Sequence, residues 1–222
     1  MVSYKLDTDL VAWYPMTEGS GTTLNDYSSN GYDLTITSPD WEKNSFQGSY
    51  GLNLGGDASG SYIRRTSTVV DITNHTICCW IKTADYATDQ QRIFETGTNA
   101  NSIIITATGT AYGSIPAKKL AWFDNSTAQN INVSWNDSWD DEWIFVVATV
   151  SNTNIELFVN GVSQVSGTIT RTNTNSAGLF LGHDSVAPND RQLNGTIAYT
   201  ILFDRILSIE EVKDIYNSTY RA

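Results

Sequence analysis

Strand-type segments recur along almost the whole chain. Each is short, rich in β-branched and aromatic residues, and bounded by Gly, Asn, Asp or Ser, which is typical of β-strands. In residues 76–82 (TICCWIK) and 143–150 (WIFVVATV) both alternating faces are apolar, as expected of strands buried between two packed layers. The pattern predicts an all-β sandwich of two sheets. The segments expected as strands are 10–16, 76–82, 91–95, 102–108, 119–123, 143–150, 154–159, 178–182 and 195–203.

Two local signals define a hairpin and a helix. The pair Asn160-Gly161 can supply two positive φ angles, so it predicts a two-residue β-hairpin turn. Ser208 and Glu211 have the spacing of a capping box, which predicts a short helix near the end of the chain. The residues expected to face the sandwich from this helix are Ile209, Val212, Ile215 and Tyr216.

The length of 222 residues suits a single sandwich domain, which we expect to span residues 1–222. Roughly 70% of the unfolded chain's surface can be buried at this size, so a core is possible without disulfides. The two cysteines, Cys78 and Cys79, are adjacent on an expected strand, where their side chains point to opposite faces. We expect both to be buried free thiols.

The charge balance excludes some partners. The net charge is −11 and the pI is about 4.4, so a nucleic acid would be repelled. No apolar run reaches the length of a membrane-spanning helix, and the opening MVSYKLDTDL lacks the pattern of a signal peptide. We therefore expect neither nucleic-acid binding nor membrane insertion.

Catalytic patterns are missing from the sequence. The contiguous Asp140-Asp141-Glu142 reads as a solvated turn, because adjacent carboxylates diverge along a chain. A Ser–His–acid triad would need a convergent histidine, and we expect both His75 and His183 to lie on the surface. The chain is predicted not to be an enzyme.

The segment LVAWYPMTEGSGTTLNDYSSNGYDLT (10–35) resembles the start of concanavalin A-like domains of the laminin G-like group. Four more segments resemble later landmarks of that family, in the same order, and the match runs from about residue 8 to 218. The resemblance implies a jelly-roll sandwich of two curved antiparallel sheets, in which the first and last strands are neighbours. The later segments are FQGSYGLNLGGDASGSYI, TICCWIKT, DDEWIFVVATVSNTNIELFVNGVSQ and NGTIAYTILFDRILSIEEVKDIY.

Relatives commonly bind one structural calcium ion, so the resemblance implies a possible calcium site. Glu18, Asp26, Asn30 and Asp57 fall in turns where oxygen ligands can converge. The alternative is that Asp26 and Asn30 only make Asx-turns. Members of the family often carry an acid shortly after the glycine of the last strand, where this chain has Ala198. Both alternatives, one structural cation or none, remain open.

The tryptophans divide into two groups. Trp13, Trp80 and Trp143 match core positions of the family. The others lie in the segment where relatives vary most, with Asn and Asp around them, as in NVSWNDSWDDEW. Flat rings beside amides and carboxylates suit the apolar faces and hydroxyl rims of sugars. Plain packing and contact with a partner protein are the alternatives. The predicted ligand-binding residues are Tyr112, Trp122, Trp135 and Trp139.

These observations predict a non-catalytic, lectin-like recognition or adhesion module. It would bind a glycan or a surface protein through the concave sheet and its rim. The alternative is a structural or decoration protein, such as a virion surface component or an adhesin spacer domain, that binds no sugar. Either role fits one part of a larger assembly. We expect an extracellular or cell-surface location as part of a longer protein, or a place on a virion surface.

Overall fold

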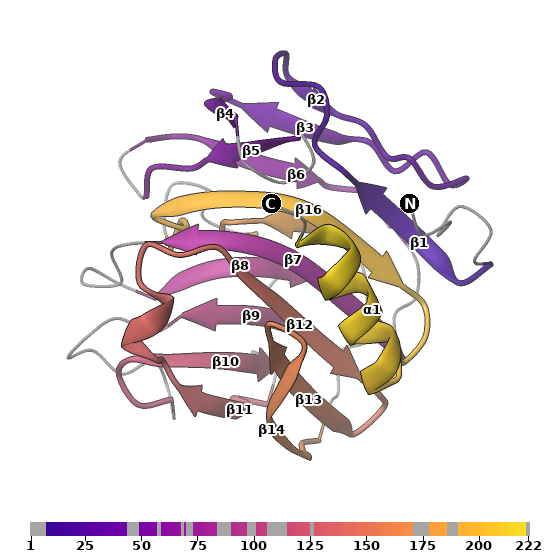
Figure 1. The fold of residues 1–222 in the computed structure, drawn as a ribbon, viewed down its shortest axis with the longest axis vertical. Coiled ribbons are helices and arrows are strands. Elements are labelled where there is room, and N and C mark those ends of the chain that lie inside the picture. The colour runs from indigo at the N-terminus through magenta and orange to yellow at the C-terminus, as the bar shows by residue number, and fades with distance from the viewer. Residues whose placement is uncertain are drawn as a thin grey trace.

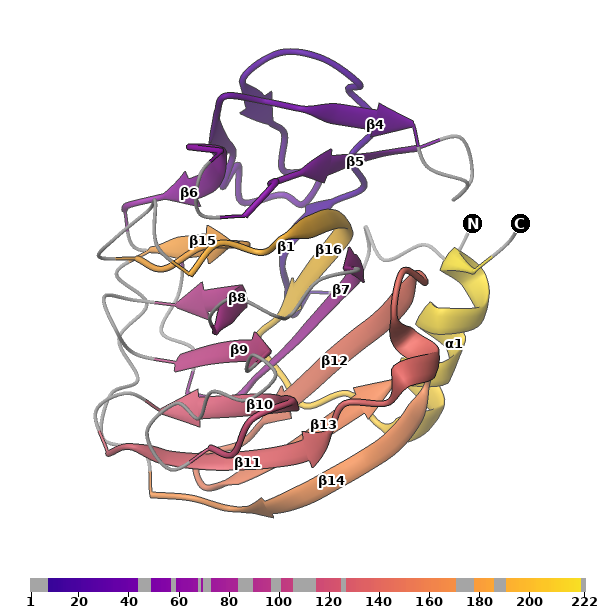
Figure 2. The same ribbon diagram turned by 90° about the vertical axis from the view of Figure 1, so that its left-hand side faces the viewer.

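The computed structural model describes residues 8–43, 49–56, 59–67, 69, 73–83, 90–96, 101–105, 115–124, 127–170, 178–185 and 191–220. In these residues two antiparallel sheets pack face to face, and a helix lies against the outer face of one of them (Figures 1 and 2). This is the two-sheet, mostly β architecture that the strand pattern predicts. In the described part of the chain no helix is long and apolar enough to span a membrane.

The first sheet, called sheet A, carries the helix. In its strand order β14-β13-β12-β7-β16-β5-β4, β16 also pairs with β1. The strands of sheet A are β1 (Leu10–Tyr14), β4 (Trp41–Lys43), β5 (Tyr50–Asn53), β7 (His75–Thr83), β12 (Ile144–Val150), β13 (Asn154–Val159), β14 (Val162–Thr168) and β16 (Gly195–Phe203).

The second sheet, called sheet B, has the order β11-β10-β9-β8-β15-β6-β3-β2. Neighbours along this path pair antiparallel, as in sheet A. The strands of sheet B are β2 (Thr23–Leu24), β3 (Leu34–Thr37), β6 (Tyr62–Arg65), β8 (Gln91–Thr96), β9 (Asn101–Ile105), β10 (Lys119–Asp124), β11 (Gln129–Ser134) and β15 (Leu179–Leu181).

The first and last strands lie side by side, as the family resemblance implies. Leu10 pairs with Phe203, and Tyr14 pairs with Thr200. A bulge between Ala198 and Ile201 marks the point where β16 changes partner from β5 to β1. Tyr199 in the bulge has a φ of 40°, which is rare for an aromatic residue. It marks a sharp change in the direction of the strand.

Each segment expected as a strand contains one, although several bounds shift. The expected strand 10–16 stops at Tyr14, because Met16 has a φ of 55° and leaves the extended conformation. Residues 106–108 lie outside the described residues. The expected strands do not include β2–β6 and β11, which are short or carry mostly polar side chains. Strand β14 is the second strand of the hairpin that Asn160-Gly161 predicts.

The core between the sheets is built from apolar residues of both. Successive residues of β7 point to opposite faces, so His75 contacts Trp122 of sheet B while Trp80 contacts the helix. Cys78 and Cys79 are buried and free, as predicted. Of the tryptophans expected in the core, Trp80 is fully buried, whereas Trp13 and Trp143 are only partly buried at its border.

The hairpin and the helix form as their local signals predict. Asn160 and Gly161 have φ angles of 52° and 75° and join β13 to β14. Helix α1 (Ile209–Thr219) begins with the predicted capping box between Ser208 and Glu211. Its buried residues are Val212, Ile215 and Thr219. Ile209 was expected to face the sandwich but is 38% exposed, at the first residue of the helix.

Candidate functional site

The aromatic residues predicted to bind a ligand lie mostly inside the molecule. Trp122 on β10 has no exposed surface, and its ring centroid is 5.5 Å from that of His75. Since a sugar needs a free ring face, the predicted stacking of Trp122 on a ligand is not supported. Tyr112 lies outside the described residues.

Trp135 and Trp139 pack against each other and do not present free ring faces to a ligand. Their ring centroids are 5.3 Å apart in an edge-to-face arrangement, and the residues are 5% and 9% exposed. The Trp135 Nε1 donates a hydrogen bond of 2.7 Å to Asp140, and the Asn136 side chain accepts from the amide of Ser138. The polar residues around these rings therefore organise the 3₁₀ turn η2 (Asp137–Trp139).

Asp26 of the predicted calcium set is a structural acceptor. Its Oδ1 accepts hydrogen bonds from the amides of Trp13 (2.9 Å) and Ser28 (2.8 Å). Its Oδ2 accepts from the Ser28 hydroxyl (2.7 Å) and the Tyr32 amide (2.8 Å). Four N–H and O–H donors point at this carboxylate, so its lone pairs are directed at protein groups. This arrangement is the Asx-turn alternative, and the bond from the Trp13 amide also connects the turn to β1.

The remaining members of that set offer few oxygens for a cation. The Asn30 amide nitrogen donates to the carbonyls of Leu10 and Val11, and Glu18 Oε1 accepts from Asn25. Glu18 Oε2 is buried and accepts no hydrogen bond within the described residues. Asp57 lies outside them.

Calcium takes six to eight oxygen ligands from carboxylates, carbonyls and waters, and both Asp26 oxygens already accept hydrogen bonds from the protein. In the described part of the chain, no group of three or more His, Cys, Asp or Glu side chains is placed to hold a metal ion. Ala198 is fully buried opposite Trp80, so it adds no ligand. The geometry of Asp26 and Asn30 does not fit a calcium site, and the calcium ion stays a prediction.

The two histidines are buried, contrary to the sequence-based expectation that both lie on the surface. His183 stands in a polar loop sequence, whereas His75 begins the apolar strand β7. His183 has no exposed surface, and its ring nitrogens face the carbonyls of Asp184 (2.8 Å) and Ile63 (3.2 Å). Burial lowers the pKa of His183 to about 4, although the two carbonyls favour the charged form. A buried histidine of this kind is a core residue.

A buried ion cluster lies on the face of sheet B that points away from the main core. Arg92 Nε is 3.2 Å from Glu95 Oε2, and Asp184 Oδ2 is 3.4 Å from Arg92 Nη2 and 2.7 Å from Arg191 Nη1. Burial raises the pKa of Glu95, against the effect of the Arg92 charge, which lowers it. Arg92, Glu95 and Asp184 are at most 1% exposed, so a ligand cannot reach them. The cluster ties β8 to the segment after β15, a structural role.

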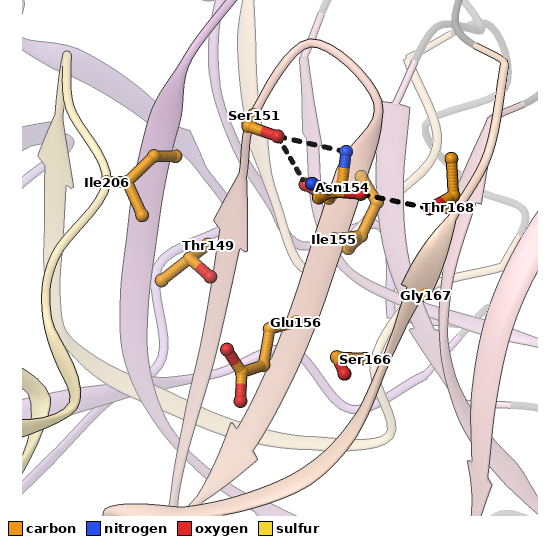
Figure 3. Close-up of a pocket in the computed structure, with 9 residues that line it drawn as sticks. All are labelled: Thr149, Ser151, Asn154, Ile155, Glu156, Ser166, Gly167, Thr168 and Ile206. Carbon is orange, nitrogen blue, oxygen red and sulfur yellow. Dashed lines mark hydrogen bonds between the residues drawn. The ribbon is translucent and has the colours of Figure 1, made fainter.

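An open hollow of about 480 Å³ lies on the outer face of sheet A, beside the loop that leads into α1 (Figure 3). We call it the outer hollow. Thr149 on β12, Glu156 on β13 and Ser166 on β14 pair directly across the sheet, so their side chains form one row. Ile206, which is 42% exposed, stands beside this row from the loop after β16.

Hydrogen bonds fix the polar groups at one end of the outer hollow. Asn154 Oδ1 accepts from the Thr168 hydroxyl at 2.9 Å, and the Ser151 hydroxyl accepts from the backbone N–H of Asn154 at 2.9 Å (Figure 3). Glu156 accepts from the Ser163 hydroxyl through Oε1. These bonds hold the hairpin side chains in place before any ligand arrives, which lowers the entropy cost of binding.

The outer hollow is suited to recognition. Its size falls within the range of ligand sites, and it combines hydroxyls, one amide and one carboxylate with the apolar surface of Ile206. Glu156 is the one carboxylate among its lining residues. Glycoside hydrolysis needs a pair of carboxyl groups, so this hollow lacks that chemistry.

Sequence reasoning missed this site because it followed the tryptophans. The available signal was the run of polar side chains at alternate positions of the hairpin, Asn154 and Glu156 on β13 and Ser166 and Thr168 on β14. Such alternation marks one exposed face of a strand pair. The contribution of Ile206 could not be read from the hairpin, because it comes from a distant segment.

Several solved structures with a similar fold are named as binding domains. The chain is similar to the binding domain of botulinum neurotoxin DC in complex with SialylT, with a TM-score of 0.70 and 16% identity over 96% of this chain and 52% of that one. It is also similar to the neurotoxin DC binding domain in complex with rat synaptotagmin II (TM-score 0.70, 14% identity, 96% and 52%). The binding domain of Paraclostridial Mosquitocidal Protein 1 is a third (TM-score 0.70, 16% identity, 96% and 53%).

This chain spans about half the length of those structures, and at such low identity the likeness shows the fold alone. No curated protein sequence matches the chain. A laminin G-like family model matches residues 56–213, which is most of the chain. The protein belongs to the concanavalin A-like lectin/glucanases superfamily.

Proposed function

We propose that this protein is a non-catalytic, lectin-like recognition module and that it binds a glycan in the outer hollow. The observation that carries the proposal is the cross-strand row of Thr149, Glu156 and Ser166 beside the exposed Ile206. Sugars present apolar C–H faces and a rim of hydroxyls. The hollow pairs an apolar side chain with groups that donate and accept hydrogen bonds, which matches both features.

The similar structures support this class of ligand. They are named for complexes with SialylT and with rat synaptotagmin II, and one is named for cell entry that depends on two ganglioside molecules. Those ligands belong to those proteins, about half of whose length this chain matches. The shared fold supports a glycan or a surface protein as the ligand, and a surface-exposed location for this module.

Titration calorimetry with a glycan that the protein retains on an array would test the assignment of the hollow. Glu156→Gln replaces a carboxylate by an amide of the same shape. It should weaken binding about tenfold, because a hydrogen bond to a charged group is worth about 1.5–3 kcal/mol. Ile206→Ser should weaken binding too, by removing the apolar contact.

Glu142→Gln is the matched control, because Glu142 is an exposed carboxylate outside the hollow. It should leave the affinity unchanged. Equal affinities of Glu156→Gln, Ile206→Ser and the wild type for the glycan would show that it does not bind in the outer hollow. If the protein retained no glycan but bound a surface protein through the same residues, a protein-binding role would replace the lectin assignment.

A further inference from the structure

A second hollow, of about 380 Å³, lies between β3 and β6 on sheet B. These strands lie far from β13 and β14 in both ribbon views, so this hollow is separate from the outer hollow (Figures 1 and 2). We call it the arginine hollow. Its lining includes Thr35, Thr37, Arg64, Arg65, Thr66 and Ser67.

Arg64 is held in a fixed orientation without a carboxylate. It pairs with Thr35 across the β3–β6 ladder, and its guanidinium carbon lies 4.7 Å from the centroid of the Tyr62 ring. Stacking on an aromatic face orients the guanidinium plane and leaves its N–H edges available. Within the described residues, Arg64 forms no ion pair with an acid.

The contrast with the other described arginines is informative. Arg92 and Arg191 contact Asp184, and Arg205 contacts Asp9 and Glu211. The chain carries a net charge of −11, so acids outnumber bases and a cation readily finds an acidic neighbour. Arg64 lines a hollow and makes no ion pair with an acid among the described residues, which leaves it available for another anion.

Arg65 directly follows Arg64 on β6, so its side chain points to the opposite face of sheet B, on the core side. Its guanidinium carbon lies 5.1 Å from the centroid of the Tyr32 ring, and Nη1 makes a long contact of 3.5 Å with the Asp33 carbonyl. Its Nε is buried and has no hydrogen-bond partner in the described part of the chain. Because this guanidinium lies on the core side, Arg65 contributes positive charge near the hollow and no direct contact with a ligand held by Arg64.

Asp33 also lines the arginine hollow, and its charge opposes an anion. Its Oδ1 accepts a hydrogen bond of 2.8 Å from the amide of Asp26. Asp33 therefore acts in the turn before β3 and makes no ion pair with Arg64 or Arg65 among the described residues. It would still repel a bound anion, and this repulsion can be tested.

We infer that the arginine hollow binds one anionic group, a carboxylate or a sulfate, carried on a saccharide. The Arg64 guanidinium can hold such a group through two charge-assisted hydrogen bonds. The hydroxyls of Thr35, Thr37, Thr66 and Ser67 are placed to meet the hydroxyls of the sugar that carries it. This site goes beyond the outer hollow, which contains a carboxylate and no cation among its lining residues.

Titration of the ¹⁵N-labelled protein, followed by NMR, would test the site directly. The probes are methyl β-D-glucuronide, methyl β-D-glucoside 6-sulfate and methyl β-D-glucoside, which share a ring but differ in the group at C6. The glucuronide or the sulfate, but not the neutral glucoside, should shift the amide signals of Thr35 and Arg64. The anionic probe that binds with the higher affinity shows whether the hollow prefers a carboxylate or a sulfate.

Three variants complete the test. Arg64→Gln should lower the affinity for the anionic probe about tenfold or more. Asp33→Asn should raise the affinity for the anionic probe about twofold, because it removes a negative charge that repels the anion. Lys213→Gln removes an exposed cation on α1, outside this hollow, and should have no effect.

Two outcomes would overturn the inference. One is equal shifts by the charged and neutral probes, or none by either. The other is an affinity for the anionic probe that Arg64→Gln leaves unchanged. Glu156→Gln should leave the anionic probe unaffected, so loss of the proposed glycan site and loss of this site are distinguishable.

Discussion

The Trp80 Nε1 lies 2.9 Å from the Thr219 hydroxyl oxygen and donates a hydrogen bond to it, linking the centre of sheet A to the last turn of α1. Thr219 in turn donates to the Ile215 carbonyl at 2.8 Å. The Trp80 ring stacks on those of Tyr216 and Tyr220, at 5.6 Å and 5.7 Å between centroids. The helix is therefore held by a polar contact inside an aromatic stack.

Replacing Trp80 by Phe should destabilise the fold more than the same change at Trp122. Both rings are fully buried, so the loss of volume is similar. Only Trp80→Phe breaks a hydrogen bond, since Trp122 Nε1 has no partner in the described residues. The difference in the free energy of unfolding should be about 1 kcal/mol. Denaturant unfolding measures it, and equal losses would show that the Trp80–Thr219 bond contributes nothing.

Asp26→Asn should lower the free energy of unfolding by about 1–3 kcal/mol, because an amide nitrogen would face a donor where a carboxylate oxygen now accepts. The loss should be the same with calcium and with a chelator, since the donors of Asp26 are protein groups. A calcium-dependent rise in the melting temperature of the wild type that disappears in Asp26→Asn would instead identify Asp26 as a calcium ligand.

Acid should destabilise the protein through His183. Burial lowers its pKa in the folded state to about 4, below the ordinary value of 6.5, so between these values the unfolded chain binds the extra proton. The stability present above pH 6.5 should therefore fall towards pH 4, by up to about 1.4 kcal/mol per pH unit. The raised pKa of Glu95 acts in the opposite direction.

Comparison with His183→Gln isolates this effect, because both proteins keep Glu95. Urea unfolding at pH 7 and pH 5 should show a larger loss of stability for the wild type. If the wild type and His183→Gln lose the same stability on acidification, His183 is not held neutral, and its two carbonyl contacts outweigh burial.

The adjacent cysteines should be inert in the folded protein. Burial raises the pKa of the Cys79 thiol to about 12, and that of Cys78 also rises well above its usual value. At pH 8 both stay protonated, and the thiolate is the reactive form. A thiol reagent should label neither residue until denaturant is added. Labelling of either under native conditions, at a rate faster than unfolding, would contradict this burial.

The sequence predicts the framework well where one physical rule dominates. Strands β7 and β12 were recognised because burial between two layers requires apolar residues on both faces. The Asn160-Gly161 turn and the Ser208–Glu211 box are local devices, and both form as expected. Edge strands such as β4 were missed, because an exposed edge needs no apolar pattern.

The proposed binding surface could not be read in the same way. His183 was expected on the surface because its neighbours in sequence are polar, but tertiary packing buries it. Trp122 looked available because it lies in a variable segment, yet strand alternation turns it towards the core. The outer hollow joins β12, β13 and β14 to Ile206, and only the fold brings these together.

A glycan array probed with the wild type and with Ser166→Trp tests the central claim most directly. Ser166 is an exposed strand residue in the outer hollow, so a tryptophan there should fill the hollow without disturbing the core. Thr23→Trp, at an exposed position of sheet B, is the control. We predict that the wild type and Thr23→Trp retain the same glycans and that Ser166→Trp loses them. Retention of those glycans by Ser166→Trp, or an array on which the wild type binds nothing, would contradict a glycan-binding role for the outer hollow.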